Sequence, residues 1–123
     1  MKKLLATAGI LLATSALIPG QAAQAASHRI VWKGSIDDSA AIYVRGGRVW
    51  NEVLRGKKVE RERSEVRSPL PYRPVHVFLL RHYGRGRIEI LRQPRAWNNY
   101  TATLRIYDPQ HGRGDYQLVL GWK

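Results

Sequence analysis

Two arginines and two large aromatic residues flank a pair of glycines in the middle of the chain. The run from Tyr43 to Trp50 reads YVRGGRVW. Guanidinium groups bind phosphate and carboxylate oxygens through paired N–H donors, and aromatic rings stack on sugars, bases and cations. This run therefore predicts a surface that binds an anionic or sugar-containing ligand.

Three further residues extend this candidate binding face. Two arginines lie beside Gly86, and a tryptophan lies in the loop that follows Pro94. Core packing is the alternative role of each tryptophan, because large aromatic side chains bury readily. The complete predicted face is Tyr43, Arg45, Arg48, Trp50, Arg85, Arg87 and Trp97.

No group of residues in the sequence has the spacing of a catalytic or metal site. The chain has no cysteine, which excludes disulfides, zinc–thiolate sites, iron–sulfur clusters and cysteine nucleophiles. No serine stands in a nucleophile-elbow pattern. Asp37 and Asp38 are adjacent and would face opposite sides of an extended chain, so they make a poor acid/base pair. We therefore expect a protein that is not an enzyme and that needs no cofactor and no metal.

The first 25 residues have the pattern of a secretory signal peptide. Lys2 and Lys3 precede an uncharged apolar run, and Ala23-Gln24-Ala25 offers small residues at a cleavage site. The apolar run is shorter than the ~20 residues that span a bilayer. We expect cleavage after residue 25, export to the periplasm or the medium, and no transmembrane segment in the remaining chain.

The predicted export changes the partner that the positive charge would attract. The whole chain carries a net charge of +12, and loss of Lys2 and Lys3 lowers it to +10. Such a field attracts polyanions. Outside the cytoplasm these are lipopolysaccharide, acidic polysaccharide and other envelope or matrix polymers, and intracellular nucleic acid is not expected. A basic but merely solvated surface is the alternative.

Short alternating apolar runs, separated by glycine and proline, predict strands for residues 26–123. We expect a single all-β domain, an antiparallel β-sandwich of immunoglobulin-like or fibronectin-like type, with a small barrel as the alternative. Residues 55–74 are expected to form a long charged connection, with room for a short strand near Val59–Val66. The seven expected strands are Arg29–Lys33, Ala40–Arg45, Arg48–Leu54, Val75–Tyr83, Arg87–Gln93, Thr101–Asp108 and Tyr116–Trp122.

Two glycine turns predict strand registers. Gly46-Gly47 suits a two-residue hairpin, which pairs Val44 with Val49 and Tyr43 with Trp50. The turn Gly84-Arg85-Gly86 suits a three-residue hairpin. That second hairpin would place Leu80 opposite Ile90 and Arg81 opposite Glu89.

Several segments together resemble small exported bacterial β-rich proteins of unassigned function. They are Trp32-Lys33-Gly34 with Asp37-Asp38, Ile42 to Gly46, Gly84 to Leu91, and Asn99 to Ala102 through the closing Trp122. The resemblance covers most of residues 26–123. It implies one exported β domain and transfers no catalytic motif.

Three functions remain open from the sequence. The first is binding of anionic envelope or extracellular polymers through arginine. The second is a carbohydrate-binding or adhesin-like module that uses Tyr43, Trp50 and Trp97. The third is a module that binds another envelope protein.

Overall fold

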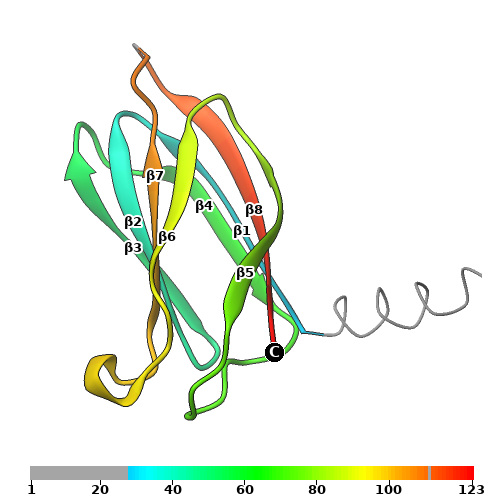
Figure 1. Cartoon of the computed structure of the whole chain (residues 1–123). Coiled ribbons are helices and arrows are strands. Elements are labelled where there is room, and N and C mark those ends of the chain that lie inside the picture. The colour runs from blue at the N-terminus through cyan, green and yellow to red at the C-terminus, as the bar shows by residue number, and fades with distance from the viewer. Residues whose placement is uncertain (1–27, 111) are drawn as a thin grey trace, which may run out of the picture.

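A computed structural model describes residues 28–110 and 112–123 and shows eight strands in two antiparallel sheets of four (Figure 1). The predicted signal peptide, residues 1–25, lies outside the described residues. Within the described part of the chain, no helix is long and apolar enough to cross a membrane.

Each sheet combines strands from both halves of the chain. One sheet has the order β4-β1-β8-β5 and the other β3-β2-β7-β6. The first comprises β1 (Arg29–Ile36), β4 (Glu60–Val66), β5 (Val77–Tyr83) and β8 (Gly114–Trp122). The second comprises β2 (Ser39–Arg45), β3 (Arg48–Arg55), β6 (Arg87–Arg92) and β7 (Ala102–Tyr107). The all-β prediction is confirmed, and two separate sheets exclude the small barrel.

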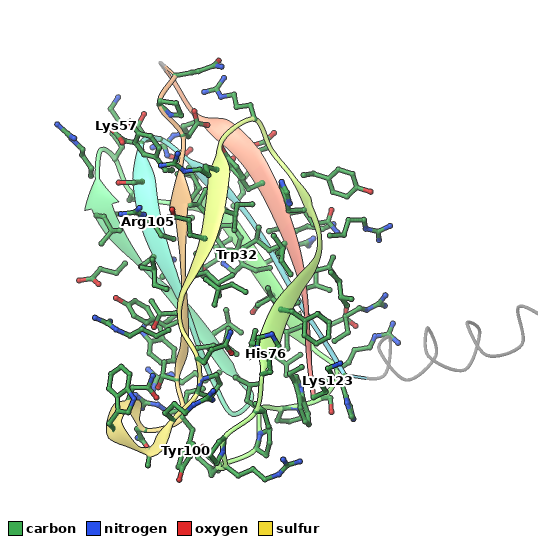
Figure 2. All side chains as sticks on the ribbon, viewed as in Figure 1. Trp32, Lys57, His76, Tyr100, Arg105 and Lys123 are labelled. Carbon is green, nitrogen blue, oxygen red and sulfur yellow. The ribbon has the colours of Figure 1, made fainter. Side chains whose placement is uncertain are left out.

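One apolar core lies between the sheets. Trp32 and Leu118 come from one sheet, and Ile42 and Leu104 come from the other, and all four belong to a single buried cluster. Trp32 lies in the space between the layers in Figure 2. Burial of such side chains stabilises by about 1.5–3 kcal/mol each. The core can therefore hold the two sheets together without cysteine.

The β2–β3 hairpin has the predicted register. Val44 pairs with Val49, and Tyr43 pairs with Trp50. Gly46 has a φ of +57°, a backbone conformation that residues other than glycine seldom adopt. Because Val44 is buried in the core, Tyr43 and Trp50 are directed to the outer surface of the sheet.

The second predicted hairpin is wrong. β5 pairs with β8 and β6 pairs with β7, so the turn at residues 84–86 connects the two sheets instead of two neighbouring strands. Glu89 pairs with Arg105 rather than Arg81, and the Arg105 guanidinium donates to its carboxylate over 2.6 Å. Ile90 pairs with the core residue Leu104. These partners on β7 satisfy the same apolar and charge pattern that suggested the hairpin.

The charged connection contains a full strand, so the strand count is eight rather than seven. β4 pairs with β1 along the edge of its sheet, near the range where the sequence leaves room for a short strand. Its mostly charged, exposed side chains suit an edge strand, because charge there discourages pairing with other molecules. The indole N–H of Trp32 donates to Glu62 Oε2 (2.8 Å) and so fixes this edge to the core.

Candidate functional site: an arginine face

The outer surface of the β3-β2-β7-β6 sheet carries six arginines and two glutamates. Alternation along each strand directs these side chains away from the core. In Figure 2, Arg105 lies on this outer side, away from Trp32. We call this surface the arginine face, and it comprises Tyr43, Arg45, Arg48, Trp50, Glu52, Arg55, Arg87, Glu89, Arg92, Thr103, Arg105 and Tyr107.

Trp50 is the centre of the hairpin end of the arginine face. Its ring stacks on Tyr43 with a centroid distance of 5.3 Å and an interplanar angle of 17°. The guanidinium groups of Arg45 and Arg48 lie 5.4 and 5.0 Å from the Trp50 ring. Arg45 Nε–H also donates to Thr101 Oγ1 (2.9 Å). The rings and the hydroxyl thus hold two cations side by side at the surface.

The Tyr43 hydroxyl connects the hairpin end to the middle of the face. It donates to Glu52 Oε1 over 2.5 Å. This hydrogen bond, and then partial burial and the Glu52 charge, raise the pKa of Tyr43 above its usual value, while Arg92 opposes the shift. Arg92 pairs with Thr103, which pairs with Tyr43, so the strand register places a further cation in the same row as the Tyr43–Trp50 stack.

At the opposite end of the face, carboxylates hold the arginines loosely. Arg87 lies over the Tyr107 ring at 5.8 Å, and its Nε lies 3.9 Å from Glu89. Arg55 Nε lies 3.9 Å from Asp38 Oδ2. These separations exceed hydrogen-bond length, so both guanidinium groups keep donors for another oxygen ligand.

Arg85 lies apart from the arginine face, although the sequence placed it there. Its Nε–H is shared by both oxygens of the buried Asp108 carboxylate (2.9 and 3.0 Å), and its Nη2 donates to the Gly112 carbonyl (3.0 Å). The side chain of Asp108 is 0% exposed. Arg85 therefore joins the turn between the sheets to the β7–β8 connection, which is a structural role.

Trp97 lies in a 3-10 turn, Ala96–Asn98, beyond the end of β6. It is 72% exposed. Tyr72 is also exposed, and its ring meets that of Tyr100 edge-on at 6.4 Å. Figure 1 shows this loop at the same end of the molecule as the β2–β3 turn. Trp97 is an exposed aromatic residue near one end of the face, not a member of the Trp50 stack.

Within the described residues, Ser35 is the serine whose hydroxyl contacts a carboxylate, and the arrangement is not that of an activated nucleophile. Ser35 Oγ–H donates to Asp115 Oδ1 (2.5 Å), and Arg61 donates to both residues. The Ser35 hydrogen bond lowers the pKa of Asp115, with help from Arg61, and so makes Asp115 a weaker base. Among residues 28–110 and 112–123, no three acidic or histidine side chains gather as a metal site would require.

Sequence reasoning missed Arg55, Arg92 and Arg105. The predicted β5–β6 hairpin placed β6 beside β5 instead of β7, so Arg92 and Arg105 were not expected on this surface. The alternation of β7 did indicate that Thr103 and Arg105 face outward, since they flank the buried Leu104. Once β7 lies beside β2, as the structure shows, these residues extend the surface of Tyr43.

Comparisons with family models, with curated proteins and with solved structures found no match to this chain. The geometry of the arginine face therefore carries the functional argument.

Proposed function

We propose that this protein is an exported, non-enzymatic β-domain that binds anionic envelope or extracellular polymers through the arginine face. One observation carries the proposal: six arginines share one sheet surface with only two glutamates, and the Trp50 ring holds two of those arginines at the hairpin end. Guanidinium forks suit phosphate, sulfate and carboxylate oxygens.

The dimensions of the face suit a polymer. Strand β2 runs from Ser39 to Arg45, so the face is about 20 Å long at ~3.3 Å per residue, and four strands make it about 14 Å wide. Several charged groups of one chain could contact such a surface together. Multiple weak contacts on one polymer give high avidity without a deep pocket.

The finer fold assignment remains a prediction. Two packed sheets support a sandwich. The pairing of β1 with β8, however, departs from the strand order of immunoglobulin constant-type domains. Superposition of the two sheets on such domains tests an immunoglobulin-like or fibronectin-like relationship.

A heparin column and lipopolysaccharide micelles, each studied over a range of salt concentrations, test the proposal. Arg45 and Arg48 form a cross-strand pair on the arginine face, and Lys33 and Arg63 form a matched pair on the outer side of the other sheet. The double substitutions Arg45→Glu/Arg48→Glu and Lys33→Glu/Arg63→Glu change the net charge equally. We expect the first variant to elute at much lower salt and the second to elute close to the unmodified protein.

Two results would overturn the proposal. Equal losses in both variants would mean that net charge alone causes retention. Absence of retention near 0.15 M salt would mean that the face binds no polyanion under relevant conditions. Thermal unfolding of both variants shows whether the sheets remain intact.

The second candidate function, glycan binding, is favoured by one observation, the 72% exposure of Trp97. Exposed rings stack on sugars. Binding of neutral glycans that disappears in Trp97→Ala, with heparin retention unchanged, would support this alternative. Binding to another envelope protein, the third prediction, would be tested by co-purification from an envelope fraction.

A further inference from the structure

A hollow of about 440 Å³ lies at the end of the arginine face that is remote from the hairpin. One row of residues crosses all four strands there, from Arg55 through Ser39 and Tyr107 to Arg87. The register shifts between Ser39 and Ala40. Such an irregularity redirects side chains. The hollow is lined by Ser39, Leu54, Arg55, Arg87, Arg105 and Tyr107.

Three arginines from three different strands thus border one concave surface. Arg105 uses one terminal nitrogen to bind Glu89 over 2.6 Å. Within the described residues, the guanidinium groups of Arg55 and Arg87 donate no hydrogen bond, and their nearest carboxylate oxygens lie 3.9 Å away. Both side chains are mostly exposed, at 79% and 67%, so their guanidinium donors are open to a ligand at the rim of the hollow.

Glu89 is the group that neutralises this cluster from within. Its carboxylate lies between Arg105 and Arg87, at 2.6 Å from one and 3.9 Å from the other. This carboxylate accepts from Arg105 and lies beside Arg87, the two groups that an external oxyanion would also use.

We propose that this hollow is a subsite for one tetrahedral oxyanion, a phosphate or sulfate ester carried on the polymer, and that Glu89 competes with it for Arg87 and Arg105. The inference rests on the proposed function and names the anion that this end of the face takes. A tetrahedral anion offers three or more oxygens, so it can accept from three guanidinium groups that approach from different strands, whereas a carboxylate offers two.

The surroundings agree with such a ligand. The volume lies within the range of ligand sites, about 300–1,000 Å³, while the lining is polar and open. Ser39 adds a hydroxyl, and Tyr107 holds the Arg87 guanidinium at 5.8 Å from its ring. An open polar hollow suits a charged group attached to a larger molecule.

Titrations with inorganic phosphate, inorganic sulfate and acetate at constant ionic strength test the subsite, with binding followed by NMR shifts of residues around the hollow. We expect phosphate or sulfate to bind and acetate to bind at least tenfold more weakly. Arg87→Gln should abolish the phosphate response. Acetate that binds as tightly as phosphate would overturn the proposal.

Glu89→Gln provides the sharper test, because the proposal predicts a gain of binding. Removal of the competing carboxylate should strengthen phosphate binding about tenfold, the effect of losing one charge-assisted competitor. Glu65→Gln makes the same charge change on the edge strand β4 and should alter binding less than twofold. Equal effects of both substitutions would overturn the role of Glu89.

Failure of the subsite and failure of the proposed function give different results. If no small anion binds while Arg45→Glu/Arg48→Glu still weakens heparin retention, the subsite is wrong and the polymer-binding face stands. If heparin retention itself is absent, the proposed function fails.

Discussion

Arginine has two different roles at the two ends of this molecule. At the turn between the sheets, Arg85 binds Asp108, whose carboxylate is fully buried and also accepts a hydrogen bond from the backbone N–H of Gln110 (3.1 Å). At the β2–β3 hairpin, Arg45 and Arg48 lie over the Trp50 ring, and neither forms an ion pair with a described residue. The first arginine completes the fold, whereas the second pair is held in place but keeps donors for a ligand.

The difference follows from the partner of each arginine. A buried carboxylate must be compensated, so loss of its arginine is costly, and loss of the carboxylate removes the hydrogen bonds that it accepts. An aromatic ring orients a cation without neutralising it, and the interaction contributes about 0.5–1 kcal/mol at an exposed site. Stability and ligand binding should therefore respond to different substitutions.

The largest expected effect is loss of stability in Asp108→Ala. The substitution removes the acceptor of Arg85, and it removes a group that joins β7 to the β7–β8 connection. We expect the free energy of unfolding to fall by about 3 kcal/mol, because the carboxylate accepts a charge-assisted hydrogen bond from Arg85 and another from the Gln110 backbone N–H. Chemical denaturation measures the loss, and heparin retention of the folded variant should not change.

Glu65→Ala is the matched control for that prediction. Its ion pair with Arg67 spans 3.7 Å, and both side chains are more than half exposed. Exposed pairs contribute about 0–1 kcal/mol, so the loss should be small. A similar loss in both variants would remove the distinction between buried and exposed arginine partners.

The next effect concerns the close packing around the Arg85 turn. Gly84 has a φ of +141°, and a Cβ built there would lie 2.2 Å from the Tyr116 ring. Tyr116 is only 3% exposed, and its burial and the neighbouring Asp108 carboxylate raise its pKa to about 12. Gly84→Ala should reduce the free energy of unfolding by about 2 kcal/mol, through strain and overpacking together.

Gly112→Ala separates those two causes. Gly112 also has a positive φ, +81°, but a Cβ there would meet nothing within 4 Å. Its substitution should cost only the backbone strain, about 1 kcal/mol. If denaturation curves of the two variants coincide, packing against Tyr116 adds nothing.

A smaller effect on stability, with a larger effect on binding, is expected for Trp50→Leu. The variant loses the stack on Tyr43 and the ring under Arg45 and Arg48, at a cost of about 1 kcal/mol. Heparin elution should move to lower salt because the two cations lose their common support. Trp50→Phe keeps a ring and should restore most of the retention. If Trp50→Leu elutes like the unmodified protein, the Trp50 ring does not support the two cations.

The two glycine turns show what the sequence could predict about the fold. The Gly46 turn lies between two strands of matching alternation, and the predicted register is the observed one. The turn at Gly84 has the same local features, yet it connects two sheets. Local sequence can specify a turn, but it cannot say whether the next strand pairs with the last one or with β7, since Glu89 finds an arginine in either arrangement.

The part of the candidate site that lies on one hairpin could be predicted from the sequence, and the part that depends on long-range strand pairing could not. Tyr43, Arg45, Arg48 and Trp50 come from one hairpin, so their common surface follows from its register. Their neighbours on β6 and β7 are brought in by pairing across long sequence separations, which no local pattern in the chain reveals. The buried partner of Arg85 was missed for the same reason, because Asp108 lies 23 residues further along the chain.

The smallest expected effect on stability belongs to Trp97→Ala, and it decides between the two leading functions. Trp97 is 72% exposed, and within the described residues its indole forms no hydrogen bond or ring contact, so the substitution should change the free energy of unfolding by less than about 0.5 kcal/mol. If arginine binds the ligand, heparin elution should also stay the same, in contrast to Trp50→Leu. If the exposed rings bind a sugar, binding of neutral glycans should disappear in Trp97→Ala and persist in Arg45→Glu/Arg48→Glu. Polyanion binding is therefore lost only in Arg45→Glu/Arg48→Glu under the first function, and glycan binding is lost only in Trp97→Ala under the second. A loss of heparin retention in Trp97→Ala would extend the arginine face to include this loop.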